Sequence, residues 1–139
     1  ADLRRDDRLQ IAVNPVFPEG QSGSIRHGLA ALDESCQAAL FMTADQPLLT
    51  SDIIDSLLAR FEASRLPICH PVVAGERRNP IIFSRALFAD LNRLSGDQGG
   101  RSVVDAQEGH IAKLEFPDSR PFADIDTIDD LRALEMQTC

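Results

Sequence analysis

The chain has 139 residues, 43% of them hydrophobic and 26% charged, which is typical of one globular domain and excludes a disordered or fibrous protein. Its formal net charge of −8, with no basic cluster beyond the N-terminal arginines and the pair Arg77 and Arg78, argues against nucleic-acid binding. The longest apolar run, residues 38–42, is too short to span a membrane, and three widely spaced cysteines are typical of a reducing compartment, so we expect a soluble cytoplasmic protein.

Short apolar runs alternate with helix-like apolar spacings, and this alternation predicts an α/β fold in which helices connect the strands of a sheet. In the first half of the chain, strands are predicted over residues 9–13 and 38–43. One helix is predicted to begin at Ser22 or Ser24 and a second at Thr50 or Ser51. The first helix should bury Ile25, Leu29 and Leu32.

In the second half, strands are predicted over residues 68–73, 81–83 and 110–116, the last of them half-buried near an edge. Helical segments are predicted after Ser84, which should cap the first of them, over residues 102–107, and from Thr127 onward. Thr127 and Asp130 have the spacing of a capping box, and Ile128, Leu131 and Leu134 should face inward. Because the sequence has neither an internal repeat nor a linker, residues 1–139 are predicted to form one domain.

Asp45 follows the predicted strand over residues 38–43, which is where ligands bind in parallel α/β sheets. Pro47 keeps Gln46 out of the helical conformation and ends the strand. A carboxylate fixed in this way can hold Mg²⁺, which prefers one or two carboxylates together with substrate phosphates. The alternative is an ordinary turn aspartate that binds nothing.

Asp124 and Asp126 are two residues apart, so in an extended segment both carboxylates point to the same face. Such a pair can complete a metal site with Asp45. The same two residues belong to an acidic C-terminal region, and the alternative is a solvated acidic tail.

Gly96, Gly99 and Gly100 precede a predicted helical segment, where exposed backbone amides favour an anion, and Arg101 adds a planar donor for phosphate or carboxylate. The turn over residues 20–24 offers hydroxyls and amides in a similar position. The alternatives are a glycine-rich turn with a surface arginine and a plain helix cap. The three histidines lack metal-ligand spacing and are interpreted as structural or surface residues.

The order of five sequence elements resembles the molybdenum cofactor cytidylyltransferase branch of the MobA-like nucleotidyltransferases. The elements are Val13-Asn14-Pro15 with Glu19-Gly20 and Ser22-Gly23-Ser24, Ala44-Asp45-Gln46-Pro47-Leu48-Leu49, Asn79-Pro80-Ile81-Ile82-Phe83, Gly96-Asp97-Gln98-Gly99-Gly100-Arg101, and Asp124-Ile125-Asp126-Thr127. They span nearly the whole chain. The fourth element is the one more particular to the cytidylyltransferase branch.

This resemblance implies a Rossmann-like three-layer fold of the nucleotide-diphospho-sugar transferase type, with a mostly parallel sheet. It also implies Mg²⁺-dependent transfer of CMP, or another NMP, from a nucleoside triphosphate to the phosphate of molybdopterin, with release of pyrophosphate. Asp45 is then the catalytic residue and a metal ligand, and Asp126 or Asp124 is the second ligand. The substrate-binding residues that the resemblance implies are Gln46, Pro47, Ser22, Gly23, Ser24, Asn79, Pro80, Asp97, Gly99, Gly100 and Arg101. A molybdoenzyme or a chaperone is the implied protein partner.

Members of this family begin with a strand and a glycine-rich loop that wraps the triphosphate and is followed by a lysine. None of the 139 residues match this loop, and Lys113 is the only lysine. We therefore expect the loop and the first strand of the sheet to precede Ala1. Two alternatives to the pterin reaction are the same fold acting on another phosphorylated acceptor, such as a sugar phosphate, and a non-catalytic module for cofactor binding or assembly.

Overall fold

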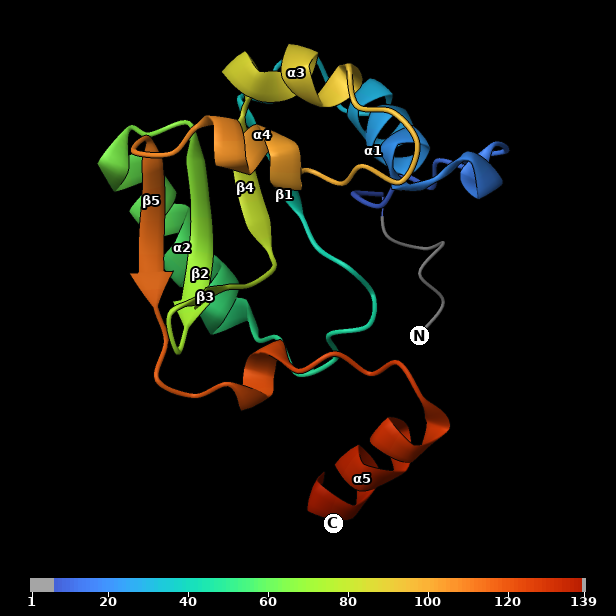
Figure 1. Ribbon diagram of the computed structural model, residues 1–139, viewed down its shortest axis with the longest axis vertical. Coiled ribbons are helices and arrows are strands. Elements are labelled where there is room, and N and C mark those ends of the chain that lie inside the picture. The colour runs from blue at the N-terminus through green and yellow to red at the C-terminus, as the bar shows by residue number, and fades with distance from the viewer. Residues whose placement is uncertain (1–6, 139) are drawn as a thin grey trace. The chain divides into compact units, whose positions relative to one another are not determined.

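The computed structural model describes residues 7–138, in which short strands alternate with helices (Figure 1). The α-helices are Gln21–Ala30 (α1), Ser51–Ser64 (α2), Phe88–Asn92 (α3), Arg101–Ala106 (α4) and Ile128–Thr138 (α5). The strands are Ala38–Phe41 (β1), Ile68–Val73 (β2), Glu76–Arg77 (β3), Ile81–Ser84 (β4) and Ile111–Glu115 (β5). Short 3-10 turns cover Phe17–Glu19 (η2), Arg85–Leu87 (η3) and Arg120–Phe122 (η4). The predicted α/β class is confirmed.

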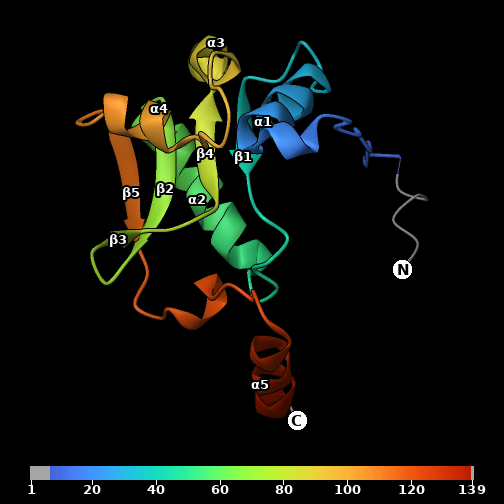
Figure 2. The same ribbon diagram turned by 45° about the vertical axis from the view of Figure 1, so that its right-hand side comes forward.

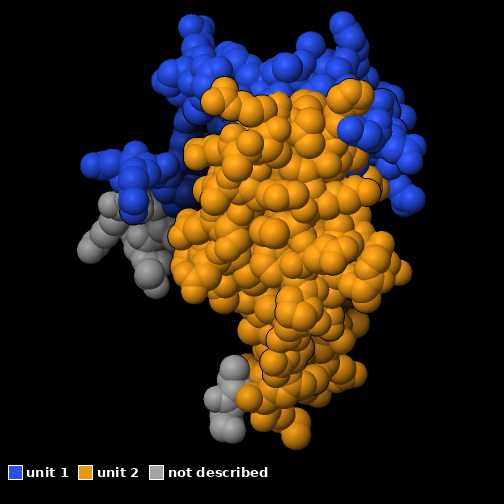
Figure 3. Space-filling model, turned by 90° about the vertical axis from the view of Figure 1, so that its left-hand side faces the viewer, with its two compact units in different colours: residues 1–39, 84–109 blue, residues 40–83, 110–139 orange. Residues whose placement is uncertain are grey.

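Two compact units make up the chain, coloured blue and orange in Figure 3. Unit 1 comprises Ala1–Ala39 and Ser84–Gly109, and unit 2 comprises Leu40–Phe83 and His110–Cys139. The residues that the sequence singles out are distributed over both units. The serine turn and the glycine-rich loop belong to unit 1, whereas Asp45 and the Asp124–Asp126 pair belong to unit 2.

The sheet is mixed, with the strand order β1-β4-β2-β3 and with β5 also paired to β2. β2 runs parallel to β5, with Ile68 opposite Ile111, and antiparallel to β3 and β4. The mostly parallel sheet expected from the sequence is therefore only partly present. A tight hairpin makes β3 antiparallel to β2. Its two turn residues, Ala74 and Gly75, have the positive φ values that such a turn requires, 50° and 79°.

The core of unit 2 lies between α2 and the strands β2 and β5 (Figures 1 and 2). Every residue of β2 is buried, including the polar His70. Thr50 caps α2 by accepting a hydrogen bond from the Ile53 amide at 3.4 Å, which confirms the predicted helix start. The apolar stripe of this helix then places Ile53 and Leu57 against the sheet.

In unit 1, α1 packs against α3 (Figure 2). α1 buries Leu29 as predicted, but Leu32 lies beyond the end of the helix and is exposed. The N-cap of α1 is Gly20, not Ser22 or Ser24, because the Ser22 hydroxyl donates to the carbonyl of Gly96 instead. Ser84 likewise makes no side-chain cap, since the segment after it begins as a 3-10 turn.

The prediction of a strand over residues 9–13 is wrong. These residues adopt no regular structure, and Val13 is 77% exposed. Strand sequences become strands only when a neighbour takes up their backbone hydrogen bonds, and among residues 7–138 none pairs with this segment.

The predicted capping box at the start of α5 is confirmed. The Thr127 amide donates to Asp130 Oδ2 at 3.0 Å, and the Asp130 amide donates to Thr127 Oγ1 at 3.1 Å. The predicted inward orientation is wrong for Ile128, which is 70% exposed, and for Leu131, which is exposed as well, whereas Leu134 is half-buried and lines a cavity. A capping box fixes where a helix begins, but it does not identify the surface on which its apolar face packs.

Among residues 7–138, no helix has both the length and the apolar character that crossing a membrane requires.

Candidate functional site

Asp45 lies in the turn that follows β1, and its backbone is joined to the segment that carries the other two predicted metal ligands. The Ile125 amide donates a hydrogen bond to the Asp45 carbonyl at 2.8 Å. Ile125 stands between Asp124 and Asp126, whose Cα atoms are each about 3.8 Å from that of Ile125. The backbones of all three aspartates therefore meet in one place in unit 2.

Gln46 makes a second connection between the same two segments. Its side-chain Nε2 donates to the Phe122 carbonyl at 3.1 Å, and the residue is only 6% exposed. Asp45 and Gln46 are therefore each hydrogen-bonded to the second segment, Asp45 to Ile125 and Gln46 to Phe122.

One oxygen of the Asp45 carboxylate lacks a hydrogen bond from the described residues. Oδ1 is buried, and no described residue donates a hydrogen bond to it. Buried polar atoms are nearly always paired, because a desolvated acceptor without a partner costs free energy. A hard divalent cation such as Mg²⁺ or Mn²⁺ would satisfy this oxygen, since both ions prefer carboxylate ligands. The residues present therefore fit such a cation.

Asp124 and Asp126 are exposed and lie in a segment without helix or strand. The Asp126 amide donates to Asp130 Oδ2 at 3.2 Å, which fixes the backbone of Asp126 at the start of α5. Hydrogen bonds from Thr127 and from the Asp126 backbone hold the pKa of the Asp130 carboxyl below its usual value. Asp130 thus remains ionised as a cap at neutral pH.

No three His, Cys, Asp or Glu side chains between residues 7 and 138 gather closely enough to enclose a metal ion. A cation at Asp45 would therefore take at most two carboxylates from this part of the chain. Its remaining positions would go to water and phosphate oxygens, which is the coordination that Mg²⁺ prefers in phosphoryl-transfer sites.

A second group of predicted residues comes together in unit 1, at the N-terminus of α1. The Ser22 amide and hydroxyl both donate to the Gly96 carbonyl, at 3.2 and 2.7 Å. Arg26 donates to the carbonyl of Leu94, just before the loop. The glycine-rich loop is therefore held by α1, while the side chains of Asp97 and Arg101 remain exposed.

Glycine is required at position 20 for this contact. Gly20 has φ 112° and ψ 179°, and a Cβ there would lie 2.3 Å from the Gly96 carbonyl oxygen. We expect Gly20→Ala to destabilise unit 1 by about 2 kcal/mol, because alanine strains this backbone conformation and collides with the loop. Urea unfolding measures the change.

The matched control for that substitution is Gly28→Ala, inside the helix α1 whose N-cap is Gly20. A Cβ at Gly28 meets no atom of residues 7–138 within 4 Å, so alanine should raise stability by up to about 1 kcal/mol through helix propensity. Equal effects of the two substitutions would contradict the contact between α1 and the loop.

Asn79 and Pro80 lie on the connection between β3 and β4. Their peptide bond is cis, Pro80 is fully buried, and Asn79 is exposed. The preceding Arg78 donates its amide to the Pro71 carbonyl at 3.0 Å, which attaches this connection to β2.

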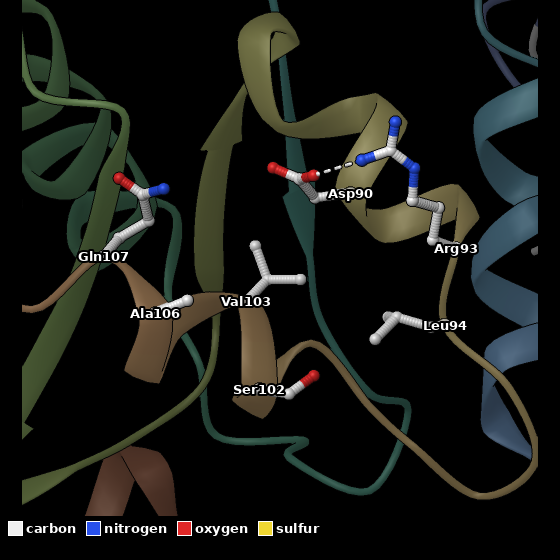
Figure 4. A pocket seen from close by; sticks show the side chains of 7 residues that line it. All are labelled: Asp90, Arg93, Leu94, Ser102, Val103, Ala106 and Gln107. Atoms are coloured by element: carbon white, nitrogen blue, oxygen red, sulfur yellow. Dashed lines mark hydrogen bonds and ion pairs between the residues drawn. The ribbon is translucent and has the colours of Figure 1, made fainter.

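Each unit has a cavity of about 250 Å³. The cavity in unit 1 lies between α3 and α4, and Figure 4 shows Arg93 pointing to Asp90, with which it pairs at 3.1 Å. The cavity in unit 2 is lined by Asp124, Ile125, Leu48 and Arg120 together with residues of α5. Sequence reasoning missed Arg120, whose guanidinium lies 2.8 Å from Asp118 and lowers the pKa of that carboxyl. No local pattern marks it, because the cavity forms from segments distant in sequence.

The buried thiol and imidazole of β2 do not supply an alternative chemistry. Burial raises the pKa of the Cys69 thiol to about 11, so it stays protonated and is a poor nucleophile. Burial lowers the pKa of His70, whose Nδ1 lies 3.0 Å from the Pro71 carbonyl oxygen. Both residues belong to the core, in agreement with the structural interpretation of the histidines.

Comparisons with curated proteins identify relatives of the chain. It is 33% identical over 134 residues to a molybdenum cofactor guanylyltransferase of Cupriavidus taiwanensis, covering 87% of this chain and 66% of that protein. It is 31% identical over 122 residues to the purine catabolism protein PucB of Bacillus subtilis, covering 86% of this chain and 58% of that protein. The chain thus spans about six-tenths of the length of these relatives.

Solved structures share the fold. A homologue of Rv0371c from Mycobacterium sp. strain JC1 superposes with a TM-score of 0.71 at 26% identity, covering 85% of this chain and 58% of that one. Rv0371c of Mycobacterium tuberculosis, solved as a complex with manganese, gives a TM-score of 0.68 at 29% identity, covering 80% of this chain and 59% of that one.

The sequence pattern of a known domain family matches most of the chain. The matched region, residues 1–111, includes Asp45, the Asn79-Pro80 pair and the glycine-rich loop. The α/β fold with its mixed sheet agrees with that of the solved structures. The match covers the family as a whole and does not separate a cytidylyl from a guanylyl branch. The chain belongs to the MobA-like NTP transferase domain family.

Proposed function

We propose that the protein is a divalent-metal-dependent nucleotidyltransferase that transfers an NMP unit from a nucleoside triphosphate to the phosphate of molybdopterin. One observation carries this proposal. Asp45 Oδ1 is buried and has no hydrogen-bond partner among residues 7–138, and the Asp45 carbonyl accepts from Ile125, which stands between two further aspartates. The family and the manganese complex of the Mycobacterium tuberculosis protein support a cation there.

In this reaction an oxygen of the acceptor phosphate attacks the α-phosphorus of the triphosphate. A new P–O bond forms, the bond between the α-phosphorus and the oxygen bridging to the β-phosphorus breaks, and pyrophosphate leaves with the electron pair. Both reactants are anionic, and a bound Mg²⁺ would screen their repulsion and stabilise the developing charge. Asp45, with Asp124 or Asp126, would hold that ion.

The remaining predicted residues would bind and orient the substrates. Arg101 is exposed and carries a guanidinium suited to a phosphate, and the backbone of Gly99 and Gly100 precedes it at the start of α4. The other residues that we propose to bind substrate are Ser22, Gly23, Ser24, Gln46, Pro47, Asn79, Pro80 and Asp97. Alignment of acceptor oxygen and α-phosphorus is worth much of the rate enhancement in such reactions.

We propose CTP as the donor, so that the transferred group is CMP. The element Gly96-Asp97-Gln98-Gly99-Gly100-Arg101 supports CTP, since it resembles the cytidylyltransferase branch. The rival donor is GTP, because the Cupriavidus taiwanensis relative is named a guanylyltransferase.

A pyrophosphate-release assay tests the function, performed on the natural protein that contains this chain. We expect release to require a divalent cation and molybdopterin together, and to be at least about tenfold faster with Mg·CTP than with Mg·GTP, a difference of about 1.4 kcal/mol in transition-state binding. Faster release with GTP would overturn the donor assignment. Pyrophosphate release with a sugar phosphate in place of molybdopterin would overturn the assignment of the acceptor. Binding of molybdopterin without any release of pyrophosphate would indicate a non-catalytic module.

A further inference from the structure

We infer that Gln46 is a positioning residue, whose side-chain amide holds residues 122–126 against Asp45 and so sets the separation of the carboxylates that share the metal ion. The inference rests on the proposed function for the metal itself. This task is separate from the substrate contact proposed for Gln46 above, because it is carried out by the bond from Nε2 to the Phe122 carbonyl.

Two hydrogen bonds define the connection. The Gln46 Nε2 donates to the Phe122 carbonyl at 3.1 Å, and the Asp45 carbonyl accepts from the Ile125 amide at 2.8 Å. The donor and acceptor groups alternate between the segments, so that each segment contributes one N–H and one carbonyl. Sliding of one segment along the other would break both bonds.

The Phe122 end of this connection is anchored in the core. Phe122 is fully buried, and its ring packs on Phe116 with a centroid separation of 5.1 Å. Gln46 therefore joins Asp45 to a point of the chain that packing already fixes. The flexible part is short, because only residues 123 and 124 separate Phe122 from Ile125.

The carboxylates of Asp124 and Asp126 depend on this hydrogen bond for their position. Asp124 and Asp126 are exposed and lie outside helices and strands, so neither is placed by packing of its own side chain, and the bond from the Asp126 amide to Asp130 ties this residue to α5 but not to Asp45. If residues 123–126 were not held against Asp45, a cation would have to order them as it bound. Its affinity would then be lower, in proportion to the fraction of molecules in which the segment already has the binding conformation.

The choice of glutamine at a buried position also points to this task. Gln46 Oε1 is buried and accepts no hydrogen bond from the described residues, which an apolar residue of similar size would avoid. What glutamine provides there, and methionine does not, is the Nε2 donor to the Phe122 carbonyl.

The test compares Gln46→Met with Gln37→Met. Gln37 is an exposed glutamine that also donates its side-chain amide to a backbone carbonyl, that of Ser35 at 3.1 Å. We expect Gln46→Met to speed amide hydrogen exchange at Ile125 and to weaken Mn²⁺ binding, measured by electron paramagnetic resonance, each on the order of tenfold, as for the loss of one buried hydrogen bond. Exchange in β2 should be unchanged, and Gln37→Met should match the wild type in both measurements.

Unchanged Mn²⁺ affinity in a folded Gln46→Met variant would overturn the inference, whether or not exchange at Ile125 increases. If that variant does not fold, the wild type provides the test, because coupling is reciprocal and saturating Mn²⁺ must slow exchange at Ile125. Exchange that does not respond to Mn²⁺ would overturn it. Failure of the proposed metal site itself is distinguished by Asp45→Asn, which in that case would bind Mn²⁺ as well as the wild type does.

Discussion

Replacing Asp45 with asparagine is expected to lower the rate of pyrophosphate release on the order of a thousandfold. Asparagine keeps the size of the side chain and the backbone bond from Ile125, but it removes the negative charge that would hold the cation. Thermal stability should not fall, because Asp45 Oδ1 accepts no hydrogen bond from the described part of the chain that asparagine would lose. The rate is measured with saturating nucleotide and acceptor, so that a loss in kcat is separated from weaker substrate binding.

Asp55→Asn is the matched control for that experiment. Asp55 is an exposed aspartate on α2 in the same unit, so the substitution makes the same change in net charge away from the candidate site. Its rate should stay within about twofold of the wild type, since exposed charges are screened. A rate for Asp45→Asn equal to that of Asp55→Asn would rule out a metal role for Asp45.

Replacing Leu57 with alanine is expected to destabilise the protein by about 3 to 4 kcal/mol, a large part of the stability of a domain of this size. Leu57 is 0% exposed and lies on the face of α2 that packs against β2 and β5. Its removal leaves a cavity in the core that supports β2. The midpoint of urea unfolding measures the loss.

The next residue along the helix provides the comparison. Leu58 is 39% exposed, and Leu58→Ala should cost less than about 1 kcal/mol. Similar losses at both positions would show that α2 packs through another face than the one described.

The sequence predicts some elements closely because their signals are local. β2 has the predicted bounds, because turn signals on both sides of a short, mostly apolar run mark where the strand begins and ends. The starts of α2 and α5 are fixed by Thr50 and by the Thr127–Asp130 pair, which act within one helical turn.

Other features depend on contacts that no local pattern encodes. The segment over residues 9–13 has strand-like residues but no described neighbour, and β3 is too short to show periodicity. The capping role expected of Ser22 gives way to a hydrogen bond with Gly96, 74 residues away. Tertiary contacts therefore decide these positions.

The candidate site shows the same division. The position of Asp45 after a buried strand and the pairing of Asp124 with Asp126 are visible in the sequence, whereas the bond between Asp45 and Ile125 follows only from the fold. The tie from Gln46 to Phe122 spans 76 residues and has no sequence signal. Arg120 and Leu48 join the same region for the same reason, since they meet only when η4 and α5 approach the turn after β1.

Crystals of the protein soaked with Mn²⁺ and examined by anomalous scattering test the shared cation most directly. We predict a peak within bonding distance, about 2.1 Å, of Asp45 Oδ1 and of a carboxylate oxygen of Asp124 or Asp126. A peak bound only to other residues, or a peak at Asp45 that neither acid reaches, would contradict the account.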